Sequence, residues 1–262
     1  GSRDLPFINL VIAACDSEVL GNGIFSHVSP NPTDEEITQG KTVFNKGEHD
    51  GVIAIGGGSG MDAGKAISLV SQNSVDLWAF DYDQPDSPEL GPDAFAPLIC
   101  VPTTAGTGAE TESTAMLTDT NHGVKRCVWH ASQKPLLAIL DPEVTVNLPA
   151  NLTAWTGCDA LIHAIEAFSV PDCHPLCDGL ALEAIRLISG SLENAVTHGD
   201  DLQARGAMLV GSCLAGISFL KGLGLVHAMS HMVGAVCDTH HGLTNAVLLP
   251  PVLLYNKEAL GE

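Results

Sequence analysis

The sequence predicts two structural halves: an α/β half built on a parallel sheet, residues 1–149, and an all-helical half, residues 150–262. Two observations predict the first half. Short apolar runs have the length of buried strands, and two of them end in loops rich in glycine or threonine. A third observation predicts the helical half: the composition changes near Leu148-Pro149, and every later segment has the pattern of a helix.

The chain is acidic and moderately apolar. It has 262 residues and a formal net charge of −20, because 31 Asp and Glu oppose 11 Lys and Arg. Such a surface repels nucleic acid and anionic membranes, so we expect neither as a partner. No uninterrupted apolar run reaches the roughly 18 residues that span a bilayer. The eight cysteines are scattered without a C-x-x-C pair, which favours reduced thiols and a cytoplasmic protein.

The first elements are expected to be a strand and a helix. Residues 7–14 have the apolar pattern of a buried strand, which ends at Asp16. Thr33 or Asp34 caps a helix that runs to about Lys46.

A glycine-rich loop follows the second predicted strand, residues 51–55. Gly56 to Gly60 contains four glycines, and a helix begins near Met61. This order can bind phosphate, because a backbone without Cβ approaches an anion closely and the N–H groups of the new helix point at it. The loop lacks the dinucleotide fingerprint G-x-G-x-x-G, and a tight structural turn explains it equally well. We expect Lys65 to be a solvated helix side chain.

A second loop, PTTAGTG (102–108), follows the strand predicted at 98–101 and offers backbone N–H groups and hydroxyls. Ligands of open α/β sheets bind at the carboxyl ends of neighbouring strands. Further strands are predicted at 114–118 and 136–140. The helical half is predicted to contain helices at about 151–169, 174–197, 201–220, 223–237 and 243–256.

An aspartate and five histidines gather in two segments of the helical half: Asp159 and His163, then His227, His231, His240 and His241. The pairs 159/163 and 227/231 are four apart, so each pair projects from one face of a helix. A carboxylate and several imidazoles on two helices suit a divalent metal such as Zn²⁺ or Fe²⁺. Ordinary core or surface histidines are the alternative, and they would need polar partners if buried.

The chain resembles the iron-containing (group III) alcohol dehydrogenases of the dehydroquinate-synthase-like superfamily. The matching segments are PNPTDEEI (30–37), GGGSGMDAGKAI (56–67), PTTAGTGAETE (102–112), LDPEVT (140–145), GCDALIHAIEA (157–167), GLVHAMSHMVGA (224–235) and HGLTNAVLLP (241–250). The resemblance implies an NAD(P)-binding α/β domain followed by a helical metal-binding domain. It also implies Fe²⁺ or Zn²⁺ and NAD or NADP as cofactors, and a homodimer or higher homo-oligomer.

The resemblance assigns roles to individual residues. The implied metal ligands are Asp159, His163, His227 and His241, with His231 near the substrate and metal and no role for His240. Our own hypothesis for His231 is that it relays the alcohol proton to solvent. The implied cofactor contacts are Gly57, Gly58 and Ser59 at the pyrophosphate, Thr103, Thr104 and Thr107 along the adenosine and nicotinamide, and Lys125 at a ribose. Asp16, after the first predicted strand, is expected to favour NAD over NADP.

Two departures from the family accompany the resemblance. The span from Val11 to Pro30 is too short for the family's full first βα unit. The family also continues through several helices beyond the residue that matches Glu262. We therefore expect a chain that is truncated, or incomplete relative to the family, at both places.

The implied activity is NAD(P)-linked oxidation of a small alcohol, or reduction of an aldehyde, with a metal as Lewis acid. A glycerol dehydrogenase-like enzyme is one alternative. A dehydroquinate synthase-like lyase is another, but it needs a basic pocket and Lys and Arg are scarce over residues 157–250. The third alternative is a non-catalytic truncated module that binds cofactor and metal without turning over an alcohol.

Overall fold

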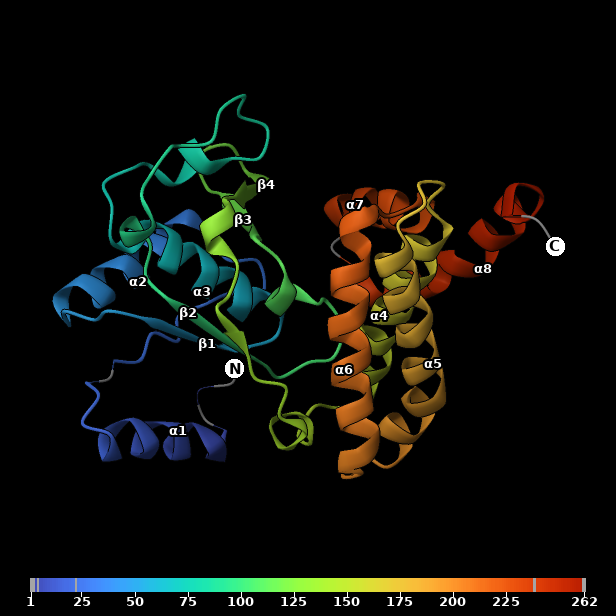
Figure 1. Cartoon of the computed structure of the whole chain (residues 1–262), viewed down its shortest axis with the longest axis horizontal. Coiled ribbons are helices and arrows are strands. Elements are labelled where there is room, and N and C mark those ends of the chain that lie inside the picture. The colour runs from blue at the N-terminus through green and yellow to red at the C-terminus, as the bar shows by residue number, and fades with distance from the viewer. Residues whose placement is uncertain (1–2, 4, 22, 238, 261–262) are drawn as a thin grey trace. The chain divides into compact units, whose positions relative to one another are not determined.

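The structure is a computed structural model that describes residues 3, 5–21, 23–237 and 239–260. It consists of two compact units, each described by itself below (Figure 1). Unit 1 comprises Gly1–Pro102 and Ala109–Ile139, and unit 2 comprises Thr103–Gly108 and Leu140–Glu262.

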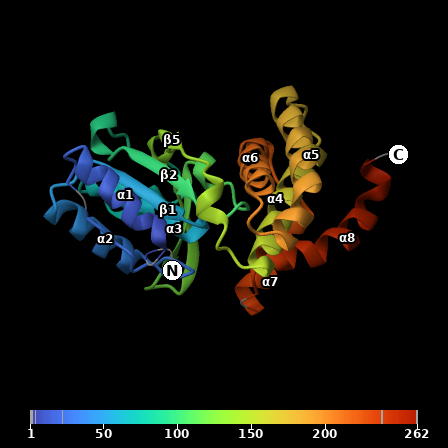
Figure 2. The ribbon, with the colours of Figure 1, turned by 90° about the horizontal axis from the view of Figure 1, so that it is seen from below.

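The sheet of unit 1 is parallel, with the strand order β1-β2-β5 (Figure 2). β1 (Val52–Gly56) pairs with β2 (Leu98–Pro102) along its whole length, and β5 (Leu137–Ala138) adds two residues on the other side of β2. The first two strands confirm the predictions, whereas β5 is shorter than expected. Because Gly56 lies opposite Pro102, the two loops that follow these strands start at the same edge of the sheet.

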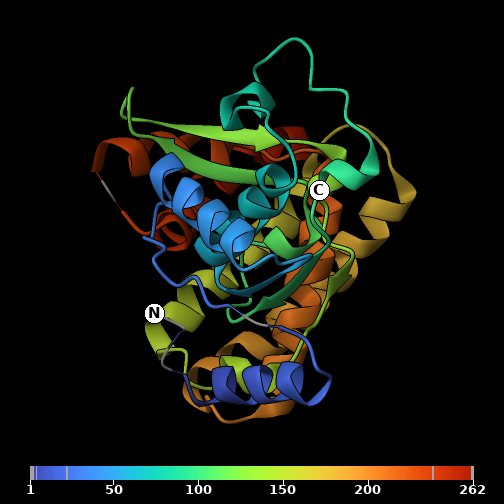
Figure 3. The same ribbon diagram turned by 90° about the vertical axis from the view of Figure 1, so that its left-hand side faces the viewer.

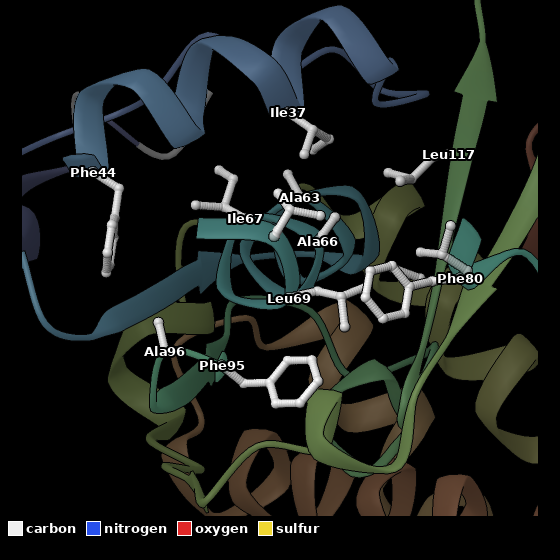
Figure 4. Packing of buried hydrophobic residues seen from close by; sticks show 13 residues of the cluster. Ile37, Phe44, Ala63, Ala66, Ile67, Leu69, Phe80, Phe95, Ala96 and Leu117 are labelled. Atoms are coloured by element: carbon white, nitrogen blue, oxygen red, sulfur yellow. The ribbon is translucent and has the colours of Figure 1, made fainter. Parts of the chain in front are cut away.

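Helix α3 (Gly58–Ser71) is the central element of unit 1, and ten of its residues are buried. It approaches β1 closely because Gly64 has no side chain: a Cβ at this position would collide with the Cβ of Ala54. Helix α2 (Asp34–Lys46) covers α3 and places Ile37 and Phe44 in the shared core (Figure 4).

The predicted start of α2 is confirmed in detail. The side chain of Thr33 accepts from the backbone N–H of Glu36, and the Glu36 carboxylate accepts from the backbone N–H of Thr33. This reciprocal arrangement is a capping box, which satisfies two backbone donors that the helix leaves without an intrahelical partner.

An antiparallel hairpin completes unit 1. β3 (Thr114–Asp119) pairs with β4 (Val124–Trp129) in a register that sets Thr114 opposite Trp129. The first strand was predicted, but the second was missed, because Lys125 and Arg126 interrupt its apolar pattern. Arg126 is held by Asp81 and Asp119, at 3.0 and 3.1 Å.

The prediction of a solvated Lys65 is wrong. Its side chain is fully buried, and its Nζ donates to the carbonyls of Ala109, at 3.0 Å, and Thr114, at 2.5 Å. The Asp62 carboxylate lies 3.2 Å away. Because β3 and the short helix at Ala109–Thr111 pack on α3, the face that carries Lys65 is inside the unit.

The prediction of a buried strand at residues 7–14 is also wrong. These residues belong to helix α1 (Pro6–Ser17; Figure 3), of which no residue is buried. A short apolar run fits a strand or a helix equally, and Pro6 is favourable at the first position of a helix. Asp16 therefore lies in the last turn of a helix and does not follow a strand.

Unit 2 is helical, and the five helices predicted for it are confirmed: α4 (Ala150–Ser169), α5 (Pro175–Thr197), α6 (Leu202–Ser218), α7 (Leu225–Cys237) and α8 (His241–Leu260). Helices α4, α5 and α6 lie side by side, and α8 packs on α4 and α7 (Figures 1 and 2).

Short 3-10 helices occur in both units, at Leu77–Phe80, Pro92–Ala94, Ala109–Thr111, Ala131–Gln133, Pro142–Thr145 and Phe219–Lys221.

One stretch of unit 2 is long and apolar enough, by composition, to cross a membrane. Leu202–Lys221 has a mean hydropathy of 1.2, and half of it is buried inside the structure. Since α6 packs against both α4 and α5, the apolar residues are those of a core helix.

Candidate functional site

Helix α4 places three acidic or imidazole side chains on one face. Asp159, His163 and Glu166 follow one another at spacings of four and three residues, and their exposed fractions are 3%, 5% and 6%. Burial of three such groups costs free energy unless each has a polar partner.

The partners come from α7 and α8. His227 is the third residue of α7 and is 3% exposed, whereas His241 is the first residue of α8. Gly242, the second residue of α8, lies inside the helix without a positive φ, so no turn requires a glycine at this position. A Cβ on Gly242 would collide with the carbonyl of Trp155, so the glycine lets α8 approach α4 and brings His241 to Asp159.

The four side chains that the resemblance singled out converge on one point. One ligand atom from each of Asp159, His163, His227 and His241 lies within 4.8 Å of the others. The Asp159 Oδ1 is 3.8 Å from the Nε2 of His163 and 3.5 Å from the Nε2 atoms of the other two histidines. A tetrahedral ion with metal–ligand bonds of about 2.1 Å separates its ligands by about 3.4 Å. These residues therefore fit a divalent ion.

The second ring nitrogens point to other groups. The Nδ1 of His227 lies 2.7 Å from a Glu166 carboxylate oxygen, and the Nδ1 of His241 lies 3.2 Å from the Ser230 hydroxyl. Among the described residues, the Nδ1 of His163 has no hydrogen-bond partner at ordinary distance and angle. The backbone of Gly106 lies near enough to this ring to favour its protonated form. Such partners fix the ring tautomer that a metal requires.

Burial and charge set the protonation of the cluster. Burial lowers the pKa of His163 to about 4 and also lowers the pKa of His241. Burial opposes the charged form of His227 too, but the carboxylates of Asp159 and Glu166 outweigh it and raise its pKa to about 9. Burial likewise disfavours the Asp159 anion, yet the imidazoles around it hold its pKa well below the usual range.

Asn245 is a site residue that sequence reasoning missed. It is fully buried, and its amide nitrogen lies 2.6 Å from the Asp159 Oδ1 and 3.1 Å from the Nε2 atoms of His227 and His241. Asn245 stands four residues after His241, which is the same spacing that drew attention to the histidine pairs. Glu166 and Ser230 were missed as well.

The remaining two histidines lie beside the cluster. The ring of His231 is exposed, and its centroid is 5.1 Å from that of His241. Its side chain is outside the group of converging ligand atoms. His240 packs on Trp155 instead, with 4.8 Å between the ring centroids.

The residues expected at the cofactor pyrophosphate open helix α3. Gly57 is the N-cap without a side-chain hydrogen bond, Gly58 and Ser59 are the first helical residues, and the first turn carries no acidic residue. The Ser59 hydroxyl donates to the carbonyl of Pro30 at 2.6 Å, so its oxygen can still accept. A helix start of this kind favours an anion.

The other expected cofactor residues have different surroundings. Thr103, Thr104 and Thr107 belong to unit 2, in a loop whose glycines pack against helices: a Cβ on Gly106 would lie 2.6 Å from Thr156, and one on Gly108 2.6 Å from Gly216. These glycines therefore have a packing explanation. Lys125 is an exposed residue of β4. Asp16 lies in α1, so the reason given for its role in choosing the cofactor no longer holds.

A parallel-sheet unit with a glycine loop, together with a helical unit in which three histidines and one aspartate could hold a metal ion, defines an α/β protein with a candidate metal site. A family model described as Iron-containing alcohol dehydrogenase matches residues 1–142. A second, described as Fe-containing alcohol dehydrogenase family, C-terminal, matches residues 153–262. The chain belongs to the iron-containing alcohol dehydrogenase family.

Individual relatives agree with this assignment. The NAD-dependent methanol dehydrogenase of Bacillus methanolicus is 42% identical over 91% of this chain and 62% of its own length. A crystal structure of 1,3-propanediol oxidoreductase superposes with a TM-score of 0.91 at 38% identity, and the match covers 97% of this chain and 65% of that one. A sulfoacetaldehyde reductase from Bifidobacterium kashiwanohense, solved in complex with NAD⁺, gives 0.86 at 30% identity, covering 95% and 66%.

The chain is shorter than these relatives. It spans 53% to 62% of the length of the first curated relatives it matches, and about two thirds of the solved chains.

Proposed function

We propose that this protein is a metal-dependent, NAD(P)-linked alcohol dehydrogenase that interconverts a small alcohol and its aldehyde. The observation that carries the proposal is the convergence of four ligand atoms, three of them from buried residues, within 4.8 Å of one another. Membership in the iron-containing alcohol dehydrogenase family and the similarity to a methanol dehydrogenase and a 1,3-propanediol oxidoreductase support it.

The proposed metal ligands are Asp159, His163, His227 and His241. Three imidazole nitrogens and one carboxylate oxygen suit Fe²⁺ and Zn²⁺ alike, and the family favours iron. When bound, the ion would supply a Lewis acid for an alcohol oxygen, and the nicotinamide cofactor would supply the acceptor for the hydride.

The chain's own residues hold and orient these groups. Glu166 and Ser230 contact the outer nitrogens of His227 and His241, so that the Nε2 atoms are presented to the ion. We assign to His231 the transfer of the alcohol proton to solvent, since its exposed ring adjoins that of His241. The main-chain N–H groups at Gly57, Gly58 and Ser59 are proposed to hold the cofactor pyrophosphate.

The remaining cofactor contacts are proposals as well. Thr103, Thr104 and Thr107 are proposed to line the cofactor, and Lys125 to reach a ribose. We propose NAD or NADP without a preference from Asp16, because this residue lies in a helix.

The experiment is an assay of the purified chain, loaded with Fe²⁺ or Zn²⁺ and supplied with either cofactor, against short primary alcohols, diols and aldehydes. Turnover that depends on the metal and is abolished in His163→Ala supports the proposal. Tight binding of metal and NADH without any turnover would favour a non-catalytic module.

We further propose a cytoplasmic homo-oligomer. The eight cysteines are scattered without a C-x-x-C pair, which supports the proposal of a reducing compartment. Large apolar side chains of α7 and α8, among them Met232 and Val236, are exposed at 69% and 83%, and we take them as candidate contacts between copies of the chain. Light scattering after size-exclusion chromatography tests the oligomer, and a monomeric mass contradicts it.

A further inference from the structure

Glu166 is a buried carboxylate that the metal site does not use as a ligand. It lies on α4 three residues after His163, with an exposed fraction of 6%. Its side chain turns toward the start of α7, which comes 60 residues later in the chain.

The Glu166 carboxylate accepts hydrogen bonds from the first residues of α7. One oxygen accepts from the backbone N–H of Val226 at 2.6 Å, and the other accepts from the backbone N–H of His227 at 3.3 Å. The second oxygen also lies 2.7 Å from the Nδ1 of His227. A carboxylate can only accept, so the Nδ1 of His227 carries a proton, and the Nε2 is the nitrogen that faces the Asp159 carboxylate.

The backbone before α7 is adapted to this carboxylate. A Cβ on Gly224 would lie 2.7 Å from a Glu166 oxygen, so a glycine is needed for the close approach. The first turn of α7 contains no acidic residue, and Glu166 supplies negative charge to this helix end from α4.

We propose that Glu166 is a positioning residue for the metal: it fixes the tautomer and direction of His227 and thereby sets the affinity of the site for a divalent ion. This inference rests on the proposed function of His227 as a ligand. A carboxylate that holds the outer nitrogen of a ligating histidine raises metal affinity without touching the ion.

The first test compares the Zn²⁺ affinity of the wild-type chain and Glu166→Gln by competition with a chromophoric chelator. The glutamine has the same shape, but its NH₂ faces an N–H donor in either orientation. We expect a loss of about 10- to 100-fold in affinity. Glu183→Gln on the surface of α5, where the carboxylate pairs with Arg186, is the control and should leave the affinity unchanged.

A second variant covers the case in which Glu166→Gln fails to fold. Gly224→Ala displaces the carboxylate without changing a charge, and we expect it to weaken Zn²⁺ binding in the same direction. Gly190→Ala on α5, where an added Cβ meets nothing within 4 Å, is its control. Wild-type affinity in both Glu166→Gln and Gly224→Ala would overturn the inference.

A double-mutant cycle separates the positioning of His227 from simple capping of α7. In a His227→Asn background the imidazole is gone, so adding Glu166→Gln should change the residual Zn²⁺ affinity by less than about twofold. If Glu166→Gln costs as much in that background as in the wild type, Glu166 acts on the helix alone and the inference is wrong. A wild-type chain that binds no Zn²⁺ at all refutes the proposed function itself, and the inference with it.

Discussion

The amide nitrogen of Asn245 lies 2.6 Å from the Oδ1 of Asp159, and both side chains are buried. The contact fixes the orientation of the amide, because the carboxylate requires a donor. The amide therefore holds the Asp159 carboxylate in place without an ion.

The substitution Asn245→Asp sets a second carboxylate against Asp159. We expect the metal-free chain to lose roughly 3 kcal/mol of stability, the size of an uncompensated buried charge. A divalent ion should compensate both charges, so the gain in melting temperature on adding Zn²⁺ should exceed that of the wild type.

Asn194→Asp is the matched control for this prediction. The Asn194 amide also contacts an aspartate, Asp201, but on the surface. Because water screens this exposed pair, Asn194→Asp should destabilise the chain far less than Asn245→Asp, and added Zn²⁺ should not raise its melting temperature. Equal losses in both variants, measured by thermal unfolding, would contradict the account of Asn245.

Lys65 is the cation of a buried acidic cluster in unit 1. Its charge acts on Asp62, Glu110 and Glu112, whose pKa values burial raises. Lys65→Met should destabilise the chain by roughly 3 kcal/mol, because the carboxylates lose their counter-charge. Lys46→Met, at the exposed end of α2, should change urea-unfolding stability by less than about 0.5 kcal/mol. A similar small effect of Lys65→Met would refute this prediction.

Glu112 should make stability depend on pH. Burial raises its pKa to about 7, above the value of 4.5 of an ordinary glutamate. The folded chain therefore holds this proton more tightly than the unfolded chain, and stability falls as the pH rises from about 4.5 to 7.

Glu112→Gln removes this titration while leaving an acceptor for the Thr114 hydroxyl, which is 2.5 Å from the carboxylate. We expect the variant to be more stable than the wild type by about 2 kcal/mol at pH 8, with a smaller difference at pH 5. Urea unfolding at both pH values measures this. An equal difference at the two values would show that the ionisation of Glu112 is not the cause.

Gly58→Val tests the cofactor loop. A branched side chain at the start of α3 should block the approach of a pyrophosphate to the backbone N–H groups, and NADH affinity should fall at least 10-fold in a fluorescence titration. Gly91→Val is the control, since an added Cβ at Gly91 meets nothing within 4 Å. Unchanged NADH affinity in Gly58→Val would show that the pyrophosphate does not bind at this loop.

Much of the fold follows from local patterns in the sequence. The buried strands before Gly57 and Thr103 and the five helices of unit 2 could be predicted, because each has a clear period and clear end signals. The structure of residues 7–14 could not be predicted, because an apolar run of this length fits a strand and a helix equally well. β4 was missed because Lys125 and Arg126 interrupt its apolar pattern, and Asp81, a partner of Arg126, lies 45 residues away in the sequence.

The candidate site was predictable in part for the same reason. Pairs four apart on a helix identified Asp159 and His163, but the role of Glu166 depends on where α7 starts in space. Asn245 repeats the spacing from His241, yet a buried asparagine in a helix carries no signal of its own. Lys65 was misjudged because its burial depends on packing by β3.

The measurement that tests the central claim most directly is the metal content of the purified chain and of six single alanine variants, at Asp159, His163, His227, His231, His240 and His241. We predict one divalent ion per wild-type chain, and its loss in the four ligand variants. His231→Ala should keep the ion while turnover slows, and His240→Ala should resemble the wild type. An ion that is lost in His231→Ala and retained in His241→Ala would contradict the ligand assignment, and a wild-type chain that turns over an alcohol without metal would contradict the mechanism.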